Sequence, residues 1–214
     1  MSLARLLKTP NVKVLNPFQT LTKAEIVRVL GAAKKSGLRD YAMMLVFLGG
    51  GLRVAEVTAL TCRDIRQDCD GGTYIHVRFG KGGKDRLVPV LEAIPEAVQA
   101  YLVANKRTLG TNDEPLFLAE DTRAGQRGIE HLGTRTCGRI LDDLCIEAGV
   151  AKVISPHSLR HTFALACLRH GKNILAVSKL LGHASIATTH RYVDHLDLME
   201  MRGVVPSYLV GGTV

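Results

Sequence analysis

The segment SPHSLRH at positions 155–161 has the pattern of a helix whose first turn binds an anion. Ser155 is a good N-cap residue and the proline after it suits the first helical position, so a helix is predicted to begin there. His157, Arg160 and His161 then lie three or four residues apart, which places them on one face of the opening turns. Free backbone N–H groups at a helix N-terminus attract anions, and an arginine beside them favours a phosphate.

This segment has two other interpretations. The face could be an ordinary polar, solvated surface above an apolar one. His157 and His161 also have the i, i+4 spacing of zinc ligands, but Ser158 stands where metalloprotease helices carry a glutamate. A third ligand is not evident and the cationic Arg160 would lie against the ion, so we predict no metal site.

The stretch GGGLRVAE at positions 49–56 is a second candidate for phosphate binding. Three glycines break the chain before a short helix, and Arg53 at its start would place a guanidinium beside free backbone donors. Glu56, one turn further on, could hold that side chain in place. The alternative is an exposed Arg–Glu pair at i, i+3, which would contribute only about 0.2–0.5 kcal/mol.

The glycine-rich stretch GKGGK at positions 80–84 joins two strand-like segments and is predicted to form the tip of a β-hairpin. It lacks the GxxxxGK[ST] pattern and does not lead into a helix, so it is not a P-loop. The tip presents Lys81 and Lys84, and Lys81 is better placed because it adjoins the end of a strand.

A predicted helix over 174–181 stops at Gly182, with His183 directly after it. Tyr192 follows nine residues later. Taken alone, a tyrosine beside Val193 is more typical of a half-buried core position than of a nucleophile. A catalytic role for Tyr192 therefore depends on the other candidates.

The elements that must position these residues are mainly helical. Thr22 to Glu25 has the pattern of a capping box that opens a helix ended by Gly37. Residues 38–48 are apolar nearly all round, which predicts a central helix broken by the glycines at 49–51. Alternation over 73–79 predicts a half-buried strand. The glycine-rich turn after it leads into a second strand over 85–90, where Pro89 favours a sheet edge, so a small antiparallel sheet is expected. Further helical patterns cover residues 92–106, 134–148, 156–170, 174–181 and 186–192. The predicted fold class is mainly α with a small antiparallel β-sheet.

Composition narrows the classes of partner. The chain has 214 residues, with 28 Lys and Arg against 20 Asp and Glu, a formal net charge of +8. This surplus favours a polyanionic partner, nucleic acid before an anionic membrane. The longest apolar stretch, 42–48, is far shorter than the roughly 20 residues of a membrane span, and no signal-peptide pattern is present, so we expect a cytoplasmic protein. The five cysteines include no CxxC pair and predict neither a disulfide framework nor a zinc site.

Together these motifs resemble the tyrosine recombinase family, which comprises the phage lambda-type integrases and the Xer resolvases. The resemblance runs from about Thr20 to about Leu196 and rests on four stretches in family order: GLRVAEVTAL, GKGGKDRLVPV, SPHSLRHTFA and LLGHASIATTHRYV. It implies the fold of the family's catalytic domain over residues 21–196. Residues 1–20 would be a lead-in, and 197–214 a tail that docks in cis or on a neighbouring protomer.

The resemblance also implies a role for each candidate residue. Tyr192 would attack a DNA phosphodiester and form a 3′-phosphotyrosyl link with release of a 5′-hydroxyl. Arg53 and Arg160 would hold the phosphate and stabilise the charge of the transition state, and Lys81 would protonate the leaving oxygen. His157 and His183 would assist proton transfer and hydrogen-bond the phosphate. The implied set is, in chain order, Arg53, Lys81, His157, Arg160, His183 and Tyr192.

The implied partner is double-stranded DNA, and recombination between two duplexes would bring four protomers together, although the chain alone could be a monomer. No metal or ATP is implied, because the covalent link conserves the bond energy for rejoining. Lys84, Arg86 and His161 are further candidate DNA contacts.

The resemblance leaves several questions open. Twenty lead-in residues cannot supply the N-terminal helical domain with which full-length members clamp DNA, so the chain is either an excised catalytic domain or a minimal recombinase. A non-cleaving DNA-binding module on the same fold and a type IB topoisomerase that relaxes supercoils are the alternative functions.

Overall fold

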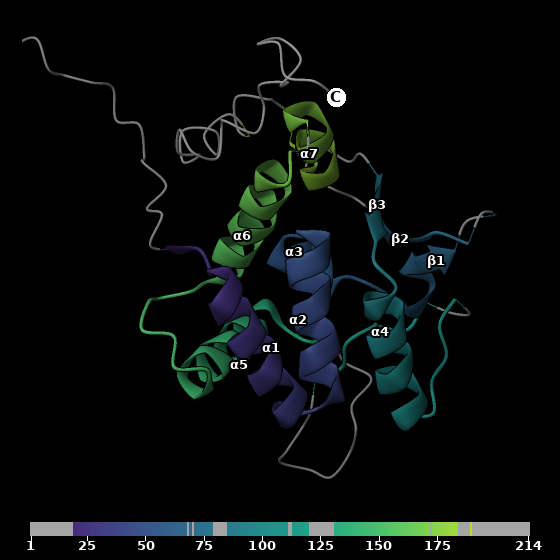
Figure 1. Ribbon diagram of the computed structural model, residues 1–214. Helices are drawn as coiled ribbons and strands as arrows, with labels where there is room; N and C mark the ends of the chain where they lie inside the picture. Colours follow the sequence, from purple (N-terminus) through teal and green to yellow (C-terminus); the bar gives the residue numbers. More distant parts are fainter. Residues whose placement is uncertain are drawn as a thin grey trace, which may run out of the picture.

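The computed structural model describes residues 19–67, 69, 71–78, 85–110, 113–119, 131–171, 173–183 and 189. This part of the chain is mainly helical, with one small sheet, as predicted (Figure 1). Its elements in chain order are α1 (Lys23–Ser36), α2 (Leu38–Gly50), α3 (Val54–Thr58), the 3-10 helix η3 (Cys62–Asp64), β1 (Ile65–Gln67), β2 (Thr73–Val77), β3 (Arg86–Val90), α4 (Ala93–Ala104), α5 (Thr134–Glu147), α6 (Pro156–Arg169) and α7 (Ile174–Leu181).

Helix α2 is the centre of the domain, as its all-round apolar sequence predicts. It packs against α1 on one side, α4 on another and α6 above (Figure 1). Met43, Met44 and Phe47 are among its fully or almost fully buried side chains. The remaining helices and the sheet are therefore arranged around the apolar helix α2.

The predicted break at Gly49 is wrong, because α2 continues through Gly50 and ends at Gly51 in the left-handed conformation. A Cβ at Gly49 would lie 2.6 Å from Ile94 Cδ1 of α4, and one at Gly50 would lie 2.6 Å from Leu52 Cδ1. The first two glycines thus allow close packing rather than ending the helix. A glycine in a helix costs only about 1 kcal/mol relative to alanine, which this packing can offset.

The sheet has the order β1-β2-β3 and is antiparallel throughout. Strand β3 lies at an edge, as Pro89 predicted, and pairs with β2 so that Val77 faces Arg86. The third strand, β1, was not predicted, because three residues are too few to show an alternating pattern. The predicted strand end at Phe79 and the hairpin tip over 80–84 lie outside the described residues.

Capping residues set the ends of the helices that carry candidate residues. Thr22 and Glu25 form the predicted capping box of α1. Ser155 caps α6 with a proline at the first position, and α7 ends at Gly182 in the left-handed conformation, both as predicted. Helices α4, α5 and α6 are one to three residues shorter than predicted, and the predicted helix over 186–192 lies outside the described residues except for Thr189.

The buried apolar side chains form two clusters of unequal size. The larger one joins α1, α2, the sheet, α4 and α5. The smaller one joins α6 to α7 and consists of Ala164, Leu165, Leu168, Val177 and Leu181. Helix α7 is thus held to α6 by a small apolar cluster, and its Leu180 packs against the larger one. Polar contacts at the end of α7 therefore contribute to its placement.

All five cysteines are free thiols. Cys137 and Cys145 are buried in α5, and burial raises the pKa of each thiol to about 11. Within the residues described, no helix combines the length and hydrophobicity needed to cross a bilayer.

Candidate active site

The turn between α2 and α3 places Arg53 beside α6. Gly51 adopts φ +60°, and a Cβ there would run into the ring of Phe163 of α6. This close approach lets the carbonyl of Gly51 accept a hydrogen bond from Arg160 Nη1 at 2.9 Å. The third glycine of the GGG stretch is therefore the one that brings the two predicted arginines to the same place.

Glu56 is the centre of the site. Its Oε1 accepts hydrogen bonds from Arg53 Nη1 at 2.7 Å and from Arg86 Nη1 at 2.9 Å. Its Oε2 accepts from the backbone N–H of Arg53 at 2.8 Å and from Arg86 Nη2 at 2.7 Å. Arg160 Nη1 lies 3.8 Å from the same oxygen. With 8% of its side chain exposed, Glu56 is a buried carboxylate shared by three arginines.

The charge of Glu56 is strongly favoured by this surrounding. Burial by itself raises the pKa of the carboxyl, but hydrogen bonds from Arg86 and from the backbone of Arg53, together with the positive charge of Arg86, lower that pKa to about 2. Glu56 is therefore ionised at neutral pH. Its contact with Arg53 is therefore not the exposed i, i+3 pair that the sequence left as an alternative, since 8% of the Glu56 side chain is exposed.

The same three arginines also reach the carboxyl end of α7. Arg86 Nε donates to the carbonyl of Leu180 at 2.8 Å and Arg53 Nη2 donates to that of Gly182 at 3.3 Å. Arg160 Nη2 donates to the carbonyl between them, that of Leu181. The last carbonyls of a helix have no partner within it and form the negative end of its dipole, so guanidinium groups stabilise them.

His183 directly follows this helix end and is half-buried. Its Nδ1 lies 2.7 Å from the hydroxyl of Thr189, which is itself fully buried. A hydrogen bond to one ring nitrogen fixes the orientation of a histidine and the tautomer presented by its other nitrogen. The ring of His183 is therefore anchored on both sides, by the end of α7 and by Thr189.

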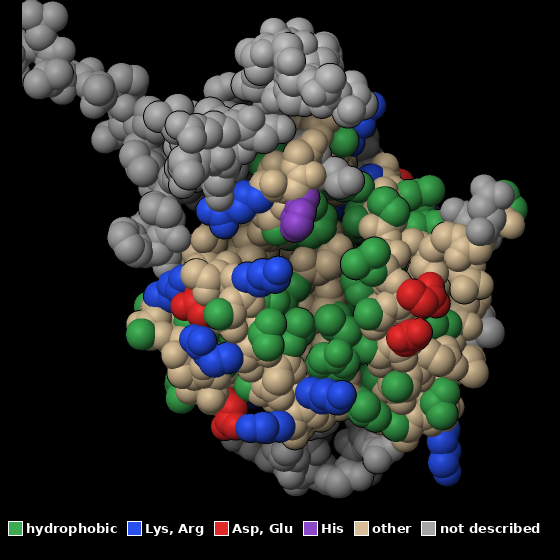
Figure 2. All heavy atoms as spheres, in the orientation of Figure 1, with side chains coloured by type: hydrophobic (Ala, Val, Ile, Leu, Met, Phe, Trp, Pro, Cys, Tyr) green, Lys and Arg blue, Asp and Glu red, His purple; other side chains and the backbone are tan. Residues whose placement is uncertain are grey.

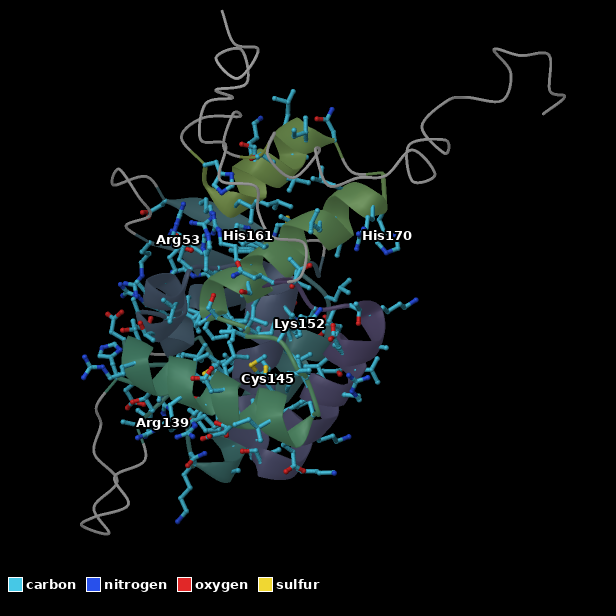
Figure 3. The ribbon with its side chains drawn as sticks, turned by 90° about the vertical axis from the view of Figure 1, so that its left-hand side faces the viewer. Arg53, Arg139, Cys145, Lys152, His161 and His170 are labelled. Atoms are coloured by element: carbon cyan, nitrogen blue, oxygen red, sulfur yellow. The ribbon has the colours of Figure 1, made fainter. Side chains whose placement is uncertain are left out.

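The start of α6 contributes a second pair of histidines. The rings of His157 and His161 meet edge to face with their centroids 4.0 Å apart. His157 is exposed, whereas His161 and Arg160 are buried, with 2% of the Arg160 side chain exposed. The alternative of a solvated polar face is therefore wrong for Arg160 and His161. Figure 3 shows His161 and Arg53 at the same end of the molecule, below α7 and far from Arg139.

The structure thus joins Arg53, Glu56, Arg160 and the segment leading to His183 through direct contacts. His157 lies on the same helix as Arg160, one turn nearer its start. The predicted general acid, the second hairpin lysine and the predicted nucleophile lie outside the described residues; they are Lys81, Lys84 and Tyr192.

Arg86 was predicted to contact DNA, but only 11% of its side chain is exposed. The contacts described above are all with other groups of the protein. A signal for this was present in the sequence. In the strand predicted over 85–90, Arg86 shares a face with Val88 because side chains alternate, and Val88 belongs to the core. An arginine on the inward face requires a buried acceptor.

A cavity of about 690 Å³ borders this cluster and is lined in part by Arg53, Glu56, Arg78 and His131. Arg53 is the most exposed of the three arginines, with 30% of its side chain accessible. Elsewhere, on the face seen in Figure 2, Lys and Arg side chains are interspersed with acidic and apolar ones. Among the residues described, no cluster of three or more potential ligand side chains could hold a metal ion.

The chain thus folds into a mainly helical domain in which Arg53, Arg86 and Arg160 surround the carboxylate of Glu56. Residues 19–199 match the phage integrase family, so the chain belongs to that family. It is 41% identical over 168 residues to "Tyrosine recombinase XerC" of Pelobacter propionicus, a match that covers 78% of this chain and 51% of the relative. It is 33% identical over 213 residues to "Tyrosine recombinase XerA" of Pyrococcus furiosus, covering 98% of this chain and 70% of the relative.

A solved structure agrees with these relatives. The crystal structure of XerA recombinase superposes with a TM-score of 0.70 at 33% identity, covering 91% of this chain and 66% of the other. The chain therefore spans about half to about two thirds of the length of the proteins that it matches.

Proposed function

We propose that this chain is the catalytic part of a site-specific DNA recombinase that cuts and rejoins strands through Tyr192. The observation that carries the proposal is the convergence of Arg53, Arg86 and Arg160, from three separate elements, on one buried carboxylate beside His183. Membership of the phage integrase family supports the same conclusion.

Fixed guanidinium groups suit phosphoryl transfer. The phosphorus passes through a transition state with concentrated negative charge, which preorganised donors stabilise without reorganising. Arginine offers two parallel N–H groups to a phosphate, which a lysine cannot do. Arg53 and Arg160 are held by Glu56 and by backbone carbonyls, so their positions are set before a phosphate arrives.

In the proposed step, the phenol oxygen of Tyr192 attacks the scissile phosphorus. A Tyr–O–P bond forms while the bond between phosphorus and the 5′-oxygen breaks. The phenol proton is transferred with the help of His157 and His183, and the leaving oxygen takes a proton from Lys81. Attack of a 5′-hydroxyl on the phosphotyrosyl link reverses the step and restores the phosphodiester, with no net hydrolysis.

The proposed partner is double-stranded DNA, in keeping with the net charge of +8. Exchange between two duplexes would place four protomers on two sites and proceed through a Holliday junction. We further propose that the protein acts in the cytoplasm at the nucleoid, that residues 21–196 are the catalytic domain, and that the apolar stretch 204–210 docks within the tail's own protomer or on its neighbour.

Trapping of a covalent adduct tests the proposal. A pool of randomised duplexes, each nicked so that cleavage releases a short fragment, is incubated with the protein, and protein-linked DNA is recovered under denaturing conditions and sequenced. We expect a defined sequence among the adducts. Tyr192→Phe should form no adduct, whereas Tyr41→Phe, a change on α2 away from the cluster, should form it normally.

DNA binding without any adduct would overturn the proposal and leave the non-cleaving DNA-binding module. Relaxation of supercoiled plasmid with adducts of no common sequence would instead indicate a topoisomerase. Site-specific adducts that exchange strands between two duplexes are the expected result.

A further inference from the structure

We propose that Arg86 is a positioning residue, which holds Glu56 and the carboxyl end of α7 together and so sets where Arg53 and His183 stand relative to each other. This inference rests on the proposed function. It assigns to Arg86 an action through neighbouring side chains rather than a contact with DNA.

The contacts of Arg86 use all three nitrogens of its guanidinium. Nη1 and Nη2 donate to the two oxygens of Glu56 at 2.9 and 2.7 Å, and Nε donates to the carbonyl of Leu180 at 2.8 Å. Arg86 is thus the one described residue whose side chain bridges Glu56 to α7 from the sheet. A lysine could replace its charge but not this planar, three-point geometry.

Gly182 makes room for this bridge. Its φ is +63°, and a Cβ on it would lie 3.0 Å from Arg86 Nη1 and 3.1 and 3.2 Å from Cδ and Cζ. The glycine between α7 and His183 therefore serves both as the helix cap and as the surface on which Arg86 lies. A side chain there would require the guanidinium to shift by a few tenths of an ångström from its place against the carbonyl of Leu180.

Arg86 acts on both supports of Arg53, while Arg160 adds a second link between them through the carbonyl of Leu181 and its 3.8 Å approach to Glu56. Arg53 donates to Glu56 Oε1 and to the carbonyl of Gly182, the two parts that Arg86 joins. His183 is the next residue after that carbonyl. Because the apolar contact of α7 with α6 is small, loss of Arg86 should let the end of α7 and the Glu56 carboxylate move apart, and with them the predicted phosphate-binding groups.

A shift of such groups by a fraction of an ångström slows chemistry more than it weakens binding. A direct phosphate contact would behave differently. Removing one phosphate-contacting charge weakens binding. It also reduces the slope of the logarithm of the binding constant against the logarithm of the salt concentration by about 1. Rate and salt dependence therefore separate the two roles of Arg86.

The test compares Arg86→Lys, Arg86→Met and the matched control Arg139→Met, which removes an exposed arginine on α5 at the far end of the molecule (Figure 3). For each variant we would measure folding by circular dichroism, DNA affinity at several salt concentrations, and the single-turnover rate of adduct formation at saturating DNA. Glu56→Gln, measured alone and added to Arg86→Met, tests whether the two side chains act as one unit.

Both Arg86 variants should bind DNA with the salt dependence of the wild type but form the adduct about 10- to 100-fold more slowly, while Arg139→Met reacts normally. The double variant should be no slower than the slower single one, because both changes disable the same bridge. If both Arg86 variants fail to fold, Gly182→Ala keeps the arginine but displaces it, and should show the same slow reaction with normal binding.

Wild-type rates in a folded Arg86→Met or, in its place, in folded Gly182→Ala would overturn the inference. So would a reduced salt dependence in Arg86→Met that Arg86→Lys restores together with the rate, since that is the behaviour of a phosphate contact. If the wild type itself forms no adduct, the proposed function fails first, and the inference falls with it.

Discussion

Glu25 and Glu56 occupy the same position in two helices and make the same local contact. Each is the third residue of its helix and accepts a hydrogen bond from the backbone N–H of the residue before the helix, at 2.7 Å from Thr22 and at 2.8 Å from Arg53. Glu25 also pairs with Lys152 at 2.8 Å, near the surface. Glu56 instead gathers three arginines in a buried setting.

The difference lies in what surrounds the same local motif. In α1 the capping residue Thr22 returns a side-chain hydrogen bond to Glu25, so the helix start is complete in itself. In α3 the residue before the helix is Arg53, whose side chain makes no such cap bond and points its guanidinium at Glu56 and α7. The motif in α1 only caps the start of a helix. The motif in α3 lacks the side-chain cap, and its two residues form part of the candidate site instead.

The comparison is tested most strongly by removing each charge without changing shape. Glu56→Gln should lower the free energy of unfolding by about 3–5 kcal/mol, because it leaves buried guanidinium groups uncompensated. Glu25→Gln should cost less than about 1 kcal/mol, since glutamine still serves at this position of a capping box and the pair with Lys152 is near the surface. Urea denaturation measures both, and equal losses would contradict the difference drawn between the two sites.

Acid titration should reveal the same contrast. The pKa of Glu56 is lowered from 4.5 to about 2, and each unit corresponds to about 1.4 kcal/mol, so its ionisation contributes about 3 kcal/mol of stability at neutral pH. The unfolded state binds more protons between these values, so this contribution is complete above pH 4.5 and is lost as the pH falls towards 2. Burial opposes ionisation of Glu25 as well, yet hydrogen bonds and the charge of Lys152 lower its pKa too.

The free energy of unfolding, measured by denaturation at a series of pH values, should therefore fall less steeply in Glu56→Gln than in the wild type over this range. Glu25→Gln should keep most of the wild-type slope. A slope that Glu56→Gln leaves unchanged would show that other carboxylates carry the acid sensitivity.

The residues that precede the two helices, Thr22 and Arg53, should differ in which property they affect. Thr22→Ala should cost about 1 kcal/mol of stability, the usual value for a lost N-cap, and leave the rate of adduct formation unchanged. The corresponding change in α3, Arg53→Ala, should slow that reaction by about 100-fold or more, the scale for removing a donor to a developing negative charge. Thermal unfolding and the trapping assay measure the two quantities, and a slow Thr22→Ala enzyme would show that α1 reaches the site.

Much of the fold could be predicted because its signals are local. The capping box at Thr22, the Ser155 cap with its following proline, and the stop at Gly182 each depend on residues within one turn of the chain. The short strand β1 and the continuation of α2 through Gly50 could not be predicted in the same way. Strand β1 exists because β2 pairs with it, and Gly50 stays helical because neighbouring side chains pack against it.

The sequence by itself determined the residue types of the candidate site, their order and their helical spacing. It also determined that Arg53 and Glu56 are close, since three residues span less than one turn. The tertiary structure alone decided that Arg160 is buried against Gly51 and Leu181. It also decided that Arg86 faces Glu56 instead of solvent. These partners lie 21 to 109 positions apart in the chain. No local pattern encodes such contacts, because they exist only where the cores of α2, α6, α7 and the sheet bring the polar groups together.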